Sequence, residues 1–403
     1  MYNNSQKSIH IFHPPLHSSR QTRGILSFLD SSKDREKFPL PQGERARVRG
    51  FLMKFSILVP AYNEEQPISS CLNSLTSLTY GDKEIIVIDD ASTDSTVQSV
   101  ERFLDKGVIL ARRKKNGGRA AALNSGLQKA TGDIIITTDA DTVVPADWLQ
   151  RFKSHFKRQG VIAVGGAYQA HNKDKPLANA TSVLDQILNG VFRKSLVPNK
   201  LSGVNSAIRR NALLDLGGFN ENSWWSEDSE LGWKLRRVGT VVYDPNNIVS
   251  TQYPDTWSGI WRRKFYWGYA MGLKFREQMP FNIKLWIRPM LFMALFLSLL
   301  TFLVTIPYGI RMYFVPGLIF LLLLNLLTLI YVPLGAVVMA RNRDRASLKT
   351  LPVLAVLPLV REFAYVFGMC LGFCKGRVGS IKPSWKEKTN YKDTEDTEKK
   401  ILI

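Results

Sequence analysis

Short runs of β-branched apolar residues alternate with longer amphipathic segments between Phe55 and Gln169, and this alternation restricts the fold more than any other feature. Runs of about four to eight apolar residues are typical of buried strands, and the amphipathic segments between them are typical of helices. Strands that alternate with helices form a largely parallel sheet with helices on both faces. The sequence therefore predicts an α/β domain with strands at residues 55–60, 84–88, 108–111, 133–137 and 161–165.

Polar side chains follow three of these strands at the point where each strand ends. They belong to the groups Tyr62-Asn63-Glu64, Asp89-Asp90 and Asp139-Ala140-Asp141. In an open parallel sheet, ligands bind beyond the carboxyl ends of the strands. A tyrosine ring can stack on a base, and an aspartate can accept a hydrogen bond from a pyrimidine N–H or a ribose hydroxyl. The sequence therefore predicts a ligand site at this edge, although Ser92 and Thr93 also suit a plain helix cap.

Asp139 and Asp141 leave one strand end with a single residue between them, so their side chains lie on the same side. A hard divalent cation such as Mg²⁺ or Mn²⁺ commonly binds one or two carboxylates together with phosphate oxygens of a substrate. The pair therefore predicts a site for Mg²⁺ or Mn²⁺. An acidic turn that caps the next helix would produce the same pattern.

The composition changes beyond Met279. Residues 285–306 and 312–340 are apolar and long enough to cross the ~30 Å hydrocarbon core of a membrane. Residues 351–374 are interrupted by two prolines and by Arg361-Glu362, which predicts an interfacial or re-entrant segment instead of a third full span. Residues 256–284 combine aromatic and basic side chains, which is typical of amphipathic helices at a membrane interface. The sequence thus predicts a membrane region at 285–374.

Basic residues indicate the orientation of this membrane region. The loop 341–349 is strongly basic, and the tail 375–403 is rich in lysine. Because basic loops remain in the cytosol, we expect the α/β domain and the tail on the cytosolic side, at the inner membrane if the cell is bacterial. The net charge of +20 would also suit nucleic acid, but the adjacent spans favour a lipid surface, so no nucleic-acid partner is predicted.

Residues 1–52 show neither periodicity nor an unbroken apolar stretch, so we expect a disordered extension without a secretory signal. Met53 directly precedes the first strand and is an alternative start of the natural chain. The three cysteines lack the spacing of a zinc site or a disulfide framework, which indicates a reducing compartment.

Four motifs, in this order, resemble those of the family 2 glycosyltransferases, which have the Rossmann-like GT-A fold. They are Y-N-E at 62–64, D-D-x-S-T-D at 89–94, N-x-G-R-x-x-A-x-N-x-G at 116–126 and D-A-D at 139–141. The match extends from about Phe55 to Gly268. The resemblance implies a GT-A domain at 53–255 and a nucleotide-sugar donor, for which a UDP-sugar is the family-based expectation.

The resemblance also implies roles for single residues. It places the base and ribose of the donor against Tyr62, Asn63 and Asp90, and the phosphates near Arg119, a position where the family frequently has lysine. Asp141 would bind the metal ion, with Asp139 close to the ribose or the metal. The full set of implied nucleotide contacts is Pro60, Tyr62, Asn63, Glu64, Asp89, Asp90, Arg119 and Asp139.

The second half of the resemblance concerns the chemistry. In the family, the Asp of an E-D pair is the catalytic base, which here is Asp228. An inverting transfer is a single displacement, so it needs one base for the acceptor hydroxyl and electrophilic help for the departing diphosphate. An acidic pair in the first turn of a helix is the structural alternative for Glu227-Asp228. Residues expected to contact the acceptor or the donor sugar are Gly203, Asn205, Trp225 and Glu227.

One departure from the family bears on the product. Processive synthases of the cellulose, chitin and hyaluronan type carry a Q-x-x-R-W motif after the base, and the nearest segment, 261–268, lacks both the Gln and the R-W pair. We therefore expect transfer of a single sugar to a lipid-linked or membrane-proximal glycan acceptor of the cell envelope. A processive polysaccharide synthase is the alternative. A non-catalytic membrane scaffold is a third hypothesis, but it would not explain two intact acidic motifs.

Overall fold

The computed structural model describes residues 53–191, 201–222, 227–278 and 350–375 of the 403-residue chain. Several predicted features lie outside the described residues, namely the extension 1–52, Trp225, the spans 285–306 and 312–340, the basic loop 341–349 and the tail beyond Lys375. The first described element is the strand β1 (Phe55–Ala61).

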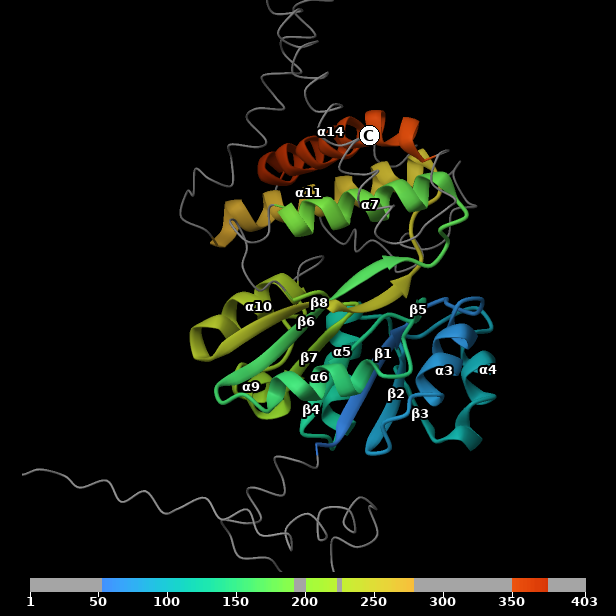
Figure 1. Cartoon of the computed structure of the whole chain (residues 1–403). Coiled ribbons are helices and arrows are strands. Elements are labelled where there is room, and N and C mark those ends of the chain that lie inside the picture. The colour runs from blue at the N-terminus through green and yellow to red at the C-terminus, as the bar shows by residue number, and fades with distance from the viewer. Residues whose placement is uncertain (1–52, 192–200, 223–226, 279–349, 376–403) are drawn as a thin grey trace, which may run out of the picture. The chain divides into compact units, whose positions relative to one another are not determined.

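One eight-stranded sheet forms the centre of the described chain (Figure 1). Its strand order is β3-β2-β1-β4-β7-β6-β8-β5. The first four strands in this order are parallel, whereas β7 runs antiparallel to both of its neighbours. All five predicted strands are present, so the predicted α/β fold is confirmed, although the second half of the sheet is mixed. The remaining strands are β2 (Lys83–Asp89), β3 (Val108–Arg112), β4 (Ile134–Thr137), β5 (Thr142–Val143), β6 (Val161–Ala170), β7 (Ser206–Arg209) and β8 (Thr240–Thr251).

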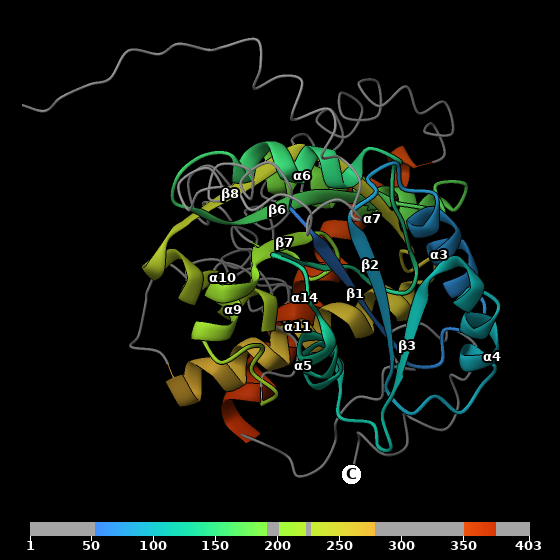
Figure 2. The same ribbon diagram turned by 90° about the horizontal axis from the view of Figure 1, so that it is seen from below.

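Helices cover both faces of the sheet (Figure 2). Side chains of β1 alternate between the two cores, with Ile57 and Val59 in one and Leu58 in the other, because successive residues of a strand point to opposite faces. The first face packs against α3 (Ile68–Thr76), α4 (Thr96–Glu101) and α6 (Trp148–Phe156), and a short 3-10 helix, η2 (Leu104–Lys106), precedes β3. The second face packs against α5 (Arg119–Lys129), α9 (Arg210–Asp215) and α10 (Glu227–Val238).

Three further helices form a layer of their own (Figure 1). α7 (Pro176–Val191) follows β6, α11 (Trp257–Gln278) follows β8, and α14 (Leu351–Lys375) contacts both helices. Because β7 is antiparallel to both β4 and β6, and β8 is parallel to β6, the strands β6 and β8 run in the same direction as β1 and β4. The helices α7 and α11 therefore begin on the side of the sheet where the carboxyl ends of β1, β2 and β4 carry the polar motifs.

The helix α14 is continuous, which corrects the predicted interruption of residues 351–374. Pro352 lies in the first turn, where a helix needs no N–H donor, and Pro358 is accommodated inside the helix. The buried charge of Arg361 is stabilised by an ion pair, in which its Nη2 lies 2.6 Å from Oδ1 of Asp185 on α7. Within the described residues Pro352–Gly372 is the one helix long and apolar enough to cross a membrane, yet 56% of its most apolar window is buried, as in a core helix of a soluble protein. The interfacial position of this segment stays a prediction.

Glycines let α11 and α14 approach until their backbones touch. A Cβ at Gly268 would overlap the carbonyl oxygen of Tyr365, and one at Gly368 would overlap that of Phe265. We therefore expect Gly268→Ala to push the helices apart and to lower the free energy of unfolding by about 1–3 kcal/mol, as measured by urea denaturation. Gly81→Ala is the matched control, because a Cβ at Gly81 meets no atom within 4 Å. Equal losses in the two variants would contradict the close packing.

Candidate active site

The loop after β1 is tied to the loop after β2 through Asn63. Its backbone lies at φ 58°, in the left-handed region that asparagine tolerates better than most residues. Its Oδ1 accepts hydrogen bonds from the backbone N–H groups of Thr93 at 2.8 Å and Asp94 at 3.3 Å, and its own N–H donates to Ser92 Oγ at 3.0 Å. The Y-N-E and D-D-x-S-T-D motifs therefore form one structural unit.

Asp89 and Asp90 are buried at the end of β2 and shape the neighbouring loops. Asp89 accepts a hydrogen bond from the N–H of Ser92 at 3.1 Å. Asp90 accepts one from the N–H of Gly118 at 2.8 Å and pairs with Arg113 at 3.0 Å. Asp90 thereby holds the start of α5 against β2, a role that the sequence did not predict.

The other predicted nucleotide residues lie at the same strand end. Pro60 is inside β1, opposite Ile88 of β2. Tyr62 is half-buried directly after β1. Glu64 is buried, and its backbone N–H donates to Thr96 Oγ1 at 2.7 Å. The structure thus brings together the predicted residues of the first two motifs.

Some buried hydrogen-bond donors in these loops have no acceptor in the protein, as far as the described residues show. In the part of the chain that the structure describes, the Nδ2 atoms of Asn63 and Asn116 are buried and have no hydrogen-bond partner. The hydroxyl of Thr138, just after β4, is in the same condition. Leaving a buried polar group unpaired costs roughly 1–3 kcal/mol, so these groups are suited to a polar ligand rich in acceptors, such as a base, ribose or phosphate.

Asp139 and Asp141 follow β4 and lie close enough to affect each other's charge. Asp141 accepts hydrogen bonds from the hydroxyls of Thr251 at 2.9 Å and Thr142 at 3.3 Å. Burial, together with the negative charge of Asp139, raises the pKa of Asp141 to about 6. Two neighbouring carboxylates repel each other, and a dication relieves this repulsion.

The acidic pair fits a metal ion that also binds oxygens of a ligand. Among the described residues, no group of three or more His, Cys, Asp or Glu could hold a metal ion by itself. Mg²⁺ characteristically keeps waters and substrate phosphates beside one or two carboxylates. Cys71 Sγ lies 3.6 Å from the carbonyl oxygen of Asp139, but burial raises the pKa of this thiol well above its ordinary value, so it stays neutral. The hard oxygen donors of the pair suit Mg²⁺ or Mn²⁺.

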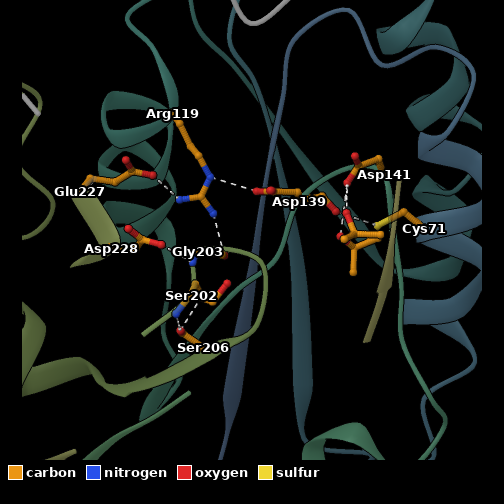
Figure 3. Close-up of polar contacts among 11 residues, drawn as sticks. Cys71, Arg119, Asp139, Asp141, Ser202, Gly203, Ser206, Glu227 and Asp228 are labelled. Carbon is orange, nitrogen blue, oxygen red and sulfur yellow. Dashed lines mark hydrogen bonds and ion pairs between the residues drawn. The ribbon is translucent and has the colours of Figure 1, made fainter. Parts of the chain in front are cut away.

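Arg119 joins three separate segments at the centre of the site (Figure 3). Its Nε donates to Asp139 Oδ1 at 2.9 Å, its Nη1 to Glu227 Oε1 at 2.8 Å, and its Nη2 to the carbonyl oxygen of Gly203 at 2.7 Å. The N–H of Gly203 in turn donates to Asp228 Oδ2 at 2.9 Å. The predicted base therefore lies in the same hydrogen-bonded network as Asp139, the first residue of the acidic pair.

Asn205, predicted to contact a sugar, has a structural role instead. It is fully buried, and its Nδ2 donates to the carbonyl oxygens of Ala167 at 2.7 Å and Asn247 at 2.8 Å. Its Oδ1 accepts a hydrogen bond from Trp148 Nε1 at 2.9 Å. With donors and acceptor engaged by protein, Asn205 is not included in the proposed sugar contacts. Trp225 lies outside the described residues.

Sequence reasoning missed two neighbours of Asp141. Thr251 of β8 supplies a hydroxyl, and Arg263 of α11 lies near enough to counteract the rise in the pKa of Asp141. The guanidinium carbon of Arg263 lies 5.3 Å from the ring centroid of Tyr253 and 5.5 Å from that of Trp267. The basic, aromatic run around Arg263 predicts a membrane interface, and no local motif indicates that Arg263 lies near Asp141.

The strand order and the helices on both faces define an α/β domain of GT-A type. A solved structure with this fold is the mannosyltransferase PcManGT from Pyrobaculum calidifontis in complex with GDP-Man and Mn²⁺, with a TM-score of 0.50 and 19% sequence identity. The match covers 88% of this chain and 96% of that chain. Residues 56–217 also match the family model described as glycosyl transferase family 2. The chain therefore contains a glycosyltransferase family 2 domain, as its motifs predicted.

Curated relatives carry the name of a polysaccharide synthase. The poly-beta-1,6-N-acetyl-D-glucosamine synthase of Staphylococcus aureus (strain COL) is 29% identical over 219 residues, and that of Staphylococcus epidermidis is 28% identical over 250 residues. The matches cover 53% and 60% of this chain, and the same shares of the relatives. The chain thus spans little more than half the length of the curated relatives that it matches.

Proposed function

We propose that this chain is an inverting glycosyltransferase that moves a sugar from a nucleotide-sugar donor to a lipid-linked or membrane-proximal acceptor. The observation that carries the proposal is the network in which Arg119 and Gly203 link Asp139 of the acidic pair to Asp228. A carboxylate pair for a metal ion and a carboxylate base are the groups that a single displacement at an anomeric carbon requires. The family 2 domain at residues 56–217 supports the same reaction class.

The donor nucleotide would bind at the loops after β1 and β2. Tyr62 offers a ring for the base, and Asn63 and Asn116 offer buried donors for base or ribose. Asp89 and Asp90 would supply acceptors, although both also hold the loops in place. We take a UDP-sugar as the donor because the synthases similar to this chain are named for N-acetylglucosamine polymers.

Asp139 and Asp141 would hold a Mg²⁺ or Mn²⁺ ion. When bound there, the metal would offset the negative charge that develops on the departing diphosphate. The raised pKa of Asp141 supports this assignment, because its causes are the desolvation of Asp141 and the neighbouring negative charge of Asp139. The mannosyltransferase PcManGT, which shares the fold, was solved in complex with Mn²⁺.

Asp228 would act as the general base. Its carboxylate takes the proton of the acceptor hydroxyl while the acceptor oxygen bonds to the anomeric carbon and the bond to the diphosphate breaks. The hydrogen bond from Gly203 orients one carboxylate oxygen of Asp228. Glu227 and Gly203 would border the sugar or the acceptor, because both lie in the hydrogen-bonded network of Asp228.

The layer of α7, α11 and α14 is the proposed acceptor side. Trp257 and Trp261 are one helical turn apart on α11, and each is 41% exposed. Val356 and Phe367 are about three turns apart on α14 and are 50% and 58% exposed. Helices with exposed aromatic and aliphatic stripes beside basic residues are typical of a membrane interface, where a lipid-linked acceptor would keep its tail in the bilayer.

We place the domain and the C-terminal tail on the cytosolic side, because the loop 341–349 is strongly basic. A compartment-specific reporter fused after Ile403 is expected to give a cytosolic signal. The same reporter fused ahead of Met53 is the control for the side of the domain. A periplasmic or lumenal signal from the first fusion alone would mean that residues 351–374 cross the membrane.

A processive polysaccharide synthase is the second candidate. The names of the Staphylococcus relatives favour it, whereas the missing Q-x-x-R-W motif favours single transfer. Product length separates the two candidates, because mass spectrometry of the reacted acceptor would show one added sugar in the first case and a ladder in the second.

The decisive experiment is a panel of nucleotide sugars. Purified full-length protein in detergent would be incubated with UDP- and GDP-sugars, with and without Mn²⁺, and release of the nucleotide diphosphate would be scored. Metal-dependent release from one donor is expected. Absence of release from every donor, with and without a membrane extract as acceptor source, would overturn the proposal.

A further inference from the structure

We propose that Arg119 is a positioning residue for the base Asp228, an inference that rests on the proposed function. Arg119 is the first residue of α5, and its side chain is 7% exposed. Its three hydrogen-bond acceptors belong to the end of β4, the loop before β7 and the start of α10. One guanidinium therefore fixes the nucleotide half of the site relative to the half that carries the base.

Arg119 reaches Asp228 by two routes. Through the first, Nη2 holds the carbonyl oxygen of Gly203 while the N–H of the same residue holds Asp228. Through the second, Nη1 holds Glu227, the residue covalently joined to Asp228. Loss of Arg119 would release both restraints and leave the buried carboxylate of Glu227 without its ion-pair partner, as far as the described residues show.

The geometry requires arginine and not just a positive charge. A guanidinium presents several N–H donors in a fixed plane, whereas the ammonium of lysine is a single point on a flexible stem. Gly203 leaves room for the guanidinium, because a Cβ at this position would lie only 2.8 Å from Nη1 and 2.9 Å from Cζ of Arg119. Any larger residue at position 203 must displace the guanidinium or the loop.

This role differs measurably from the phosphate contact that the family resemblance implies for Arg119. A residue that positions the base acts on the chemical step and leaves the binding of the nucleotide unchanged. A residue that contacts phosphate instead discriminates a diphosphate from a monophosphate. The two roles therefore predict opposite patterns of kcat and Kd.

Two variants of the full chain, Arg119→Lys and Gly203→Ala, test the inference. Arg119→Ala is avoided, because it would leave the carboxylates of Asp139 and Glu227 without their hydrogen-bond donor and could prevent folding. Each variant is expected to lower kcat by about 100-fold, the cost of a misplaced catalytic group, while Kd for UDP and for UMP, measured with Mn²⁺ at saturation because Arg119 also bonds to Asp139, changes less than about twofold. Arg102→Lys, on the exposed end of α4, is the matched control and should match the wild type. Thermal melting checks that each variant is folded.

The decisive readout is coupling to the base. In an Asp228→Asn background, Arg119→Lys is expected to have almost no further effect on kcat, because a base that is absent cannot be misplaced. Three results would each overturn the positioning role. The first is an unchanged kcat in both single variants, and the second is a fully additive loss of kcat in the double variant. The third is weaker binding of UDP without weaker binding of UMP. A wild-type protein that neither binds nucleotide nor releases it from any donor would instead overturn the proposed function.

Discussion

Asp228→Asn is expected to lower turnover by about 10²–10⁴-fold, the usual contribution of a general base, with nucleotide affinity within about twofold of the wild type. The amide keeps the size of the carboxylate but cannot take the proton of the acceptor hydroxyl. Its one oxygen can still accept the hydrogen bond that Gly203 donates at 2.9 Å, which should keep the Gly203 loop in place, whereas its amide nitrogen cannot accept the bond that the N–H of Ser229 donates to the other carboxylate oxygen.

Calorimetric titration with UDP and steady-state turnover of the same preparation would measure the two quantities for Asp228→Asn. Asp105→Asn, an exposed carboxylate in η2, is the control and should retain full activity. If the Asp228 variant lost nucleotide affinity and turnover in equal measure, Asp228 would belong to the donor site and another group would have to be the base.

Asp141→Ala is expected to reduce turnover more than about 100-fold and to weaken nucleotide binding as well, because a lost metal ligand removes binding and chemistry together. The hydroxyls of Thr251 and Thr142 hold Asp141 in place, and among the described residues no group of three or more His, Cys, Asp or Glu could bind the metal ion in its absence.

A chelator makes the Asp141 experiment specific. With Mn²⁺ present, wild type should bind UDP more tightly than Asp141→Ala, and in excess EDTA the two proteins should bind it equally. Asp147→Ala, an exposed carboxylate at the start of α6 that pairs with Arg151, is the control for a general loss of negative charge. Equal UDP affinity of wild type and Asp141→Ala in Mn²⁺ would contradict the metal assignment.

The two variants together separate the halves of the site. Asp228→Asn should affect only the chemical step, whereas Asp141→Ala should affect both binding and the chemical step. Arg119 lies between them, with hydrogen bonds to Asp139 on one side and to Glu227 on the other. Its variants should therefore resemble Asp228→Asn if it positions the base.

Much of the first half of the domain could be predicted from the sequence, because the signals there are local. Apolar runs of strand length predicted β1, β2, β3, β4 and the first part of β6 nearly to the residue. The carboxyl ends of parallel strands meet at one sheet edge, so the motifs that follow them had to be neighbours. Motif order was also enough to predict the family 2 domain at residues 56–217.

Other features depended on the path of the chain. The prolines and the Arg361-Glu362 pair argued for a broken segment, yet α14 is continuous because α11 and α7 provide close backbone contact and a carboxylate, Asp185, for Arg361. Asn205 lies in a motif segment, but its side chain forms hydrogen bonds with other buried groups of the protein. The periodicity of a sequence does not predict which residue will form the hydrogen bond or ion pair with a buried polar side chain.

The sequence by itself determined the α/β layout and the acidic pair, since strand pattern and motif spacing are properties of neighbouring residues, and its resemblance to the family implied Asp228 as the candidate base. Only the tertiary structure decided that Arg119 bonds to Glu227, 108 residues away, and that Gly203 passes this restraint to Asp228. Only the fold also brought Thr251 and Arg263 to Asp141. The physical reason is that hydrogen bonds and ion pairs depend on distance in space, which the reversal at β7 and the return of the chain through β8 and α11 set for residues far apart in sequence.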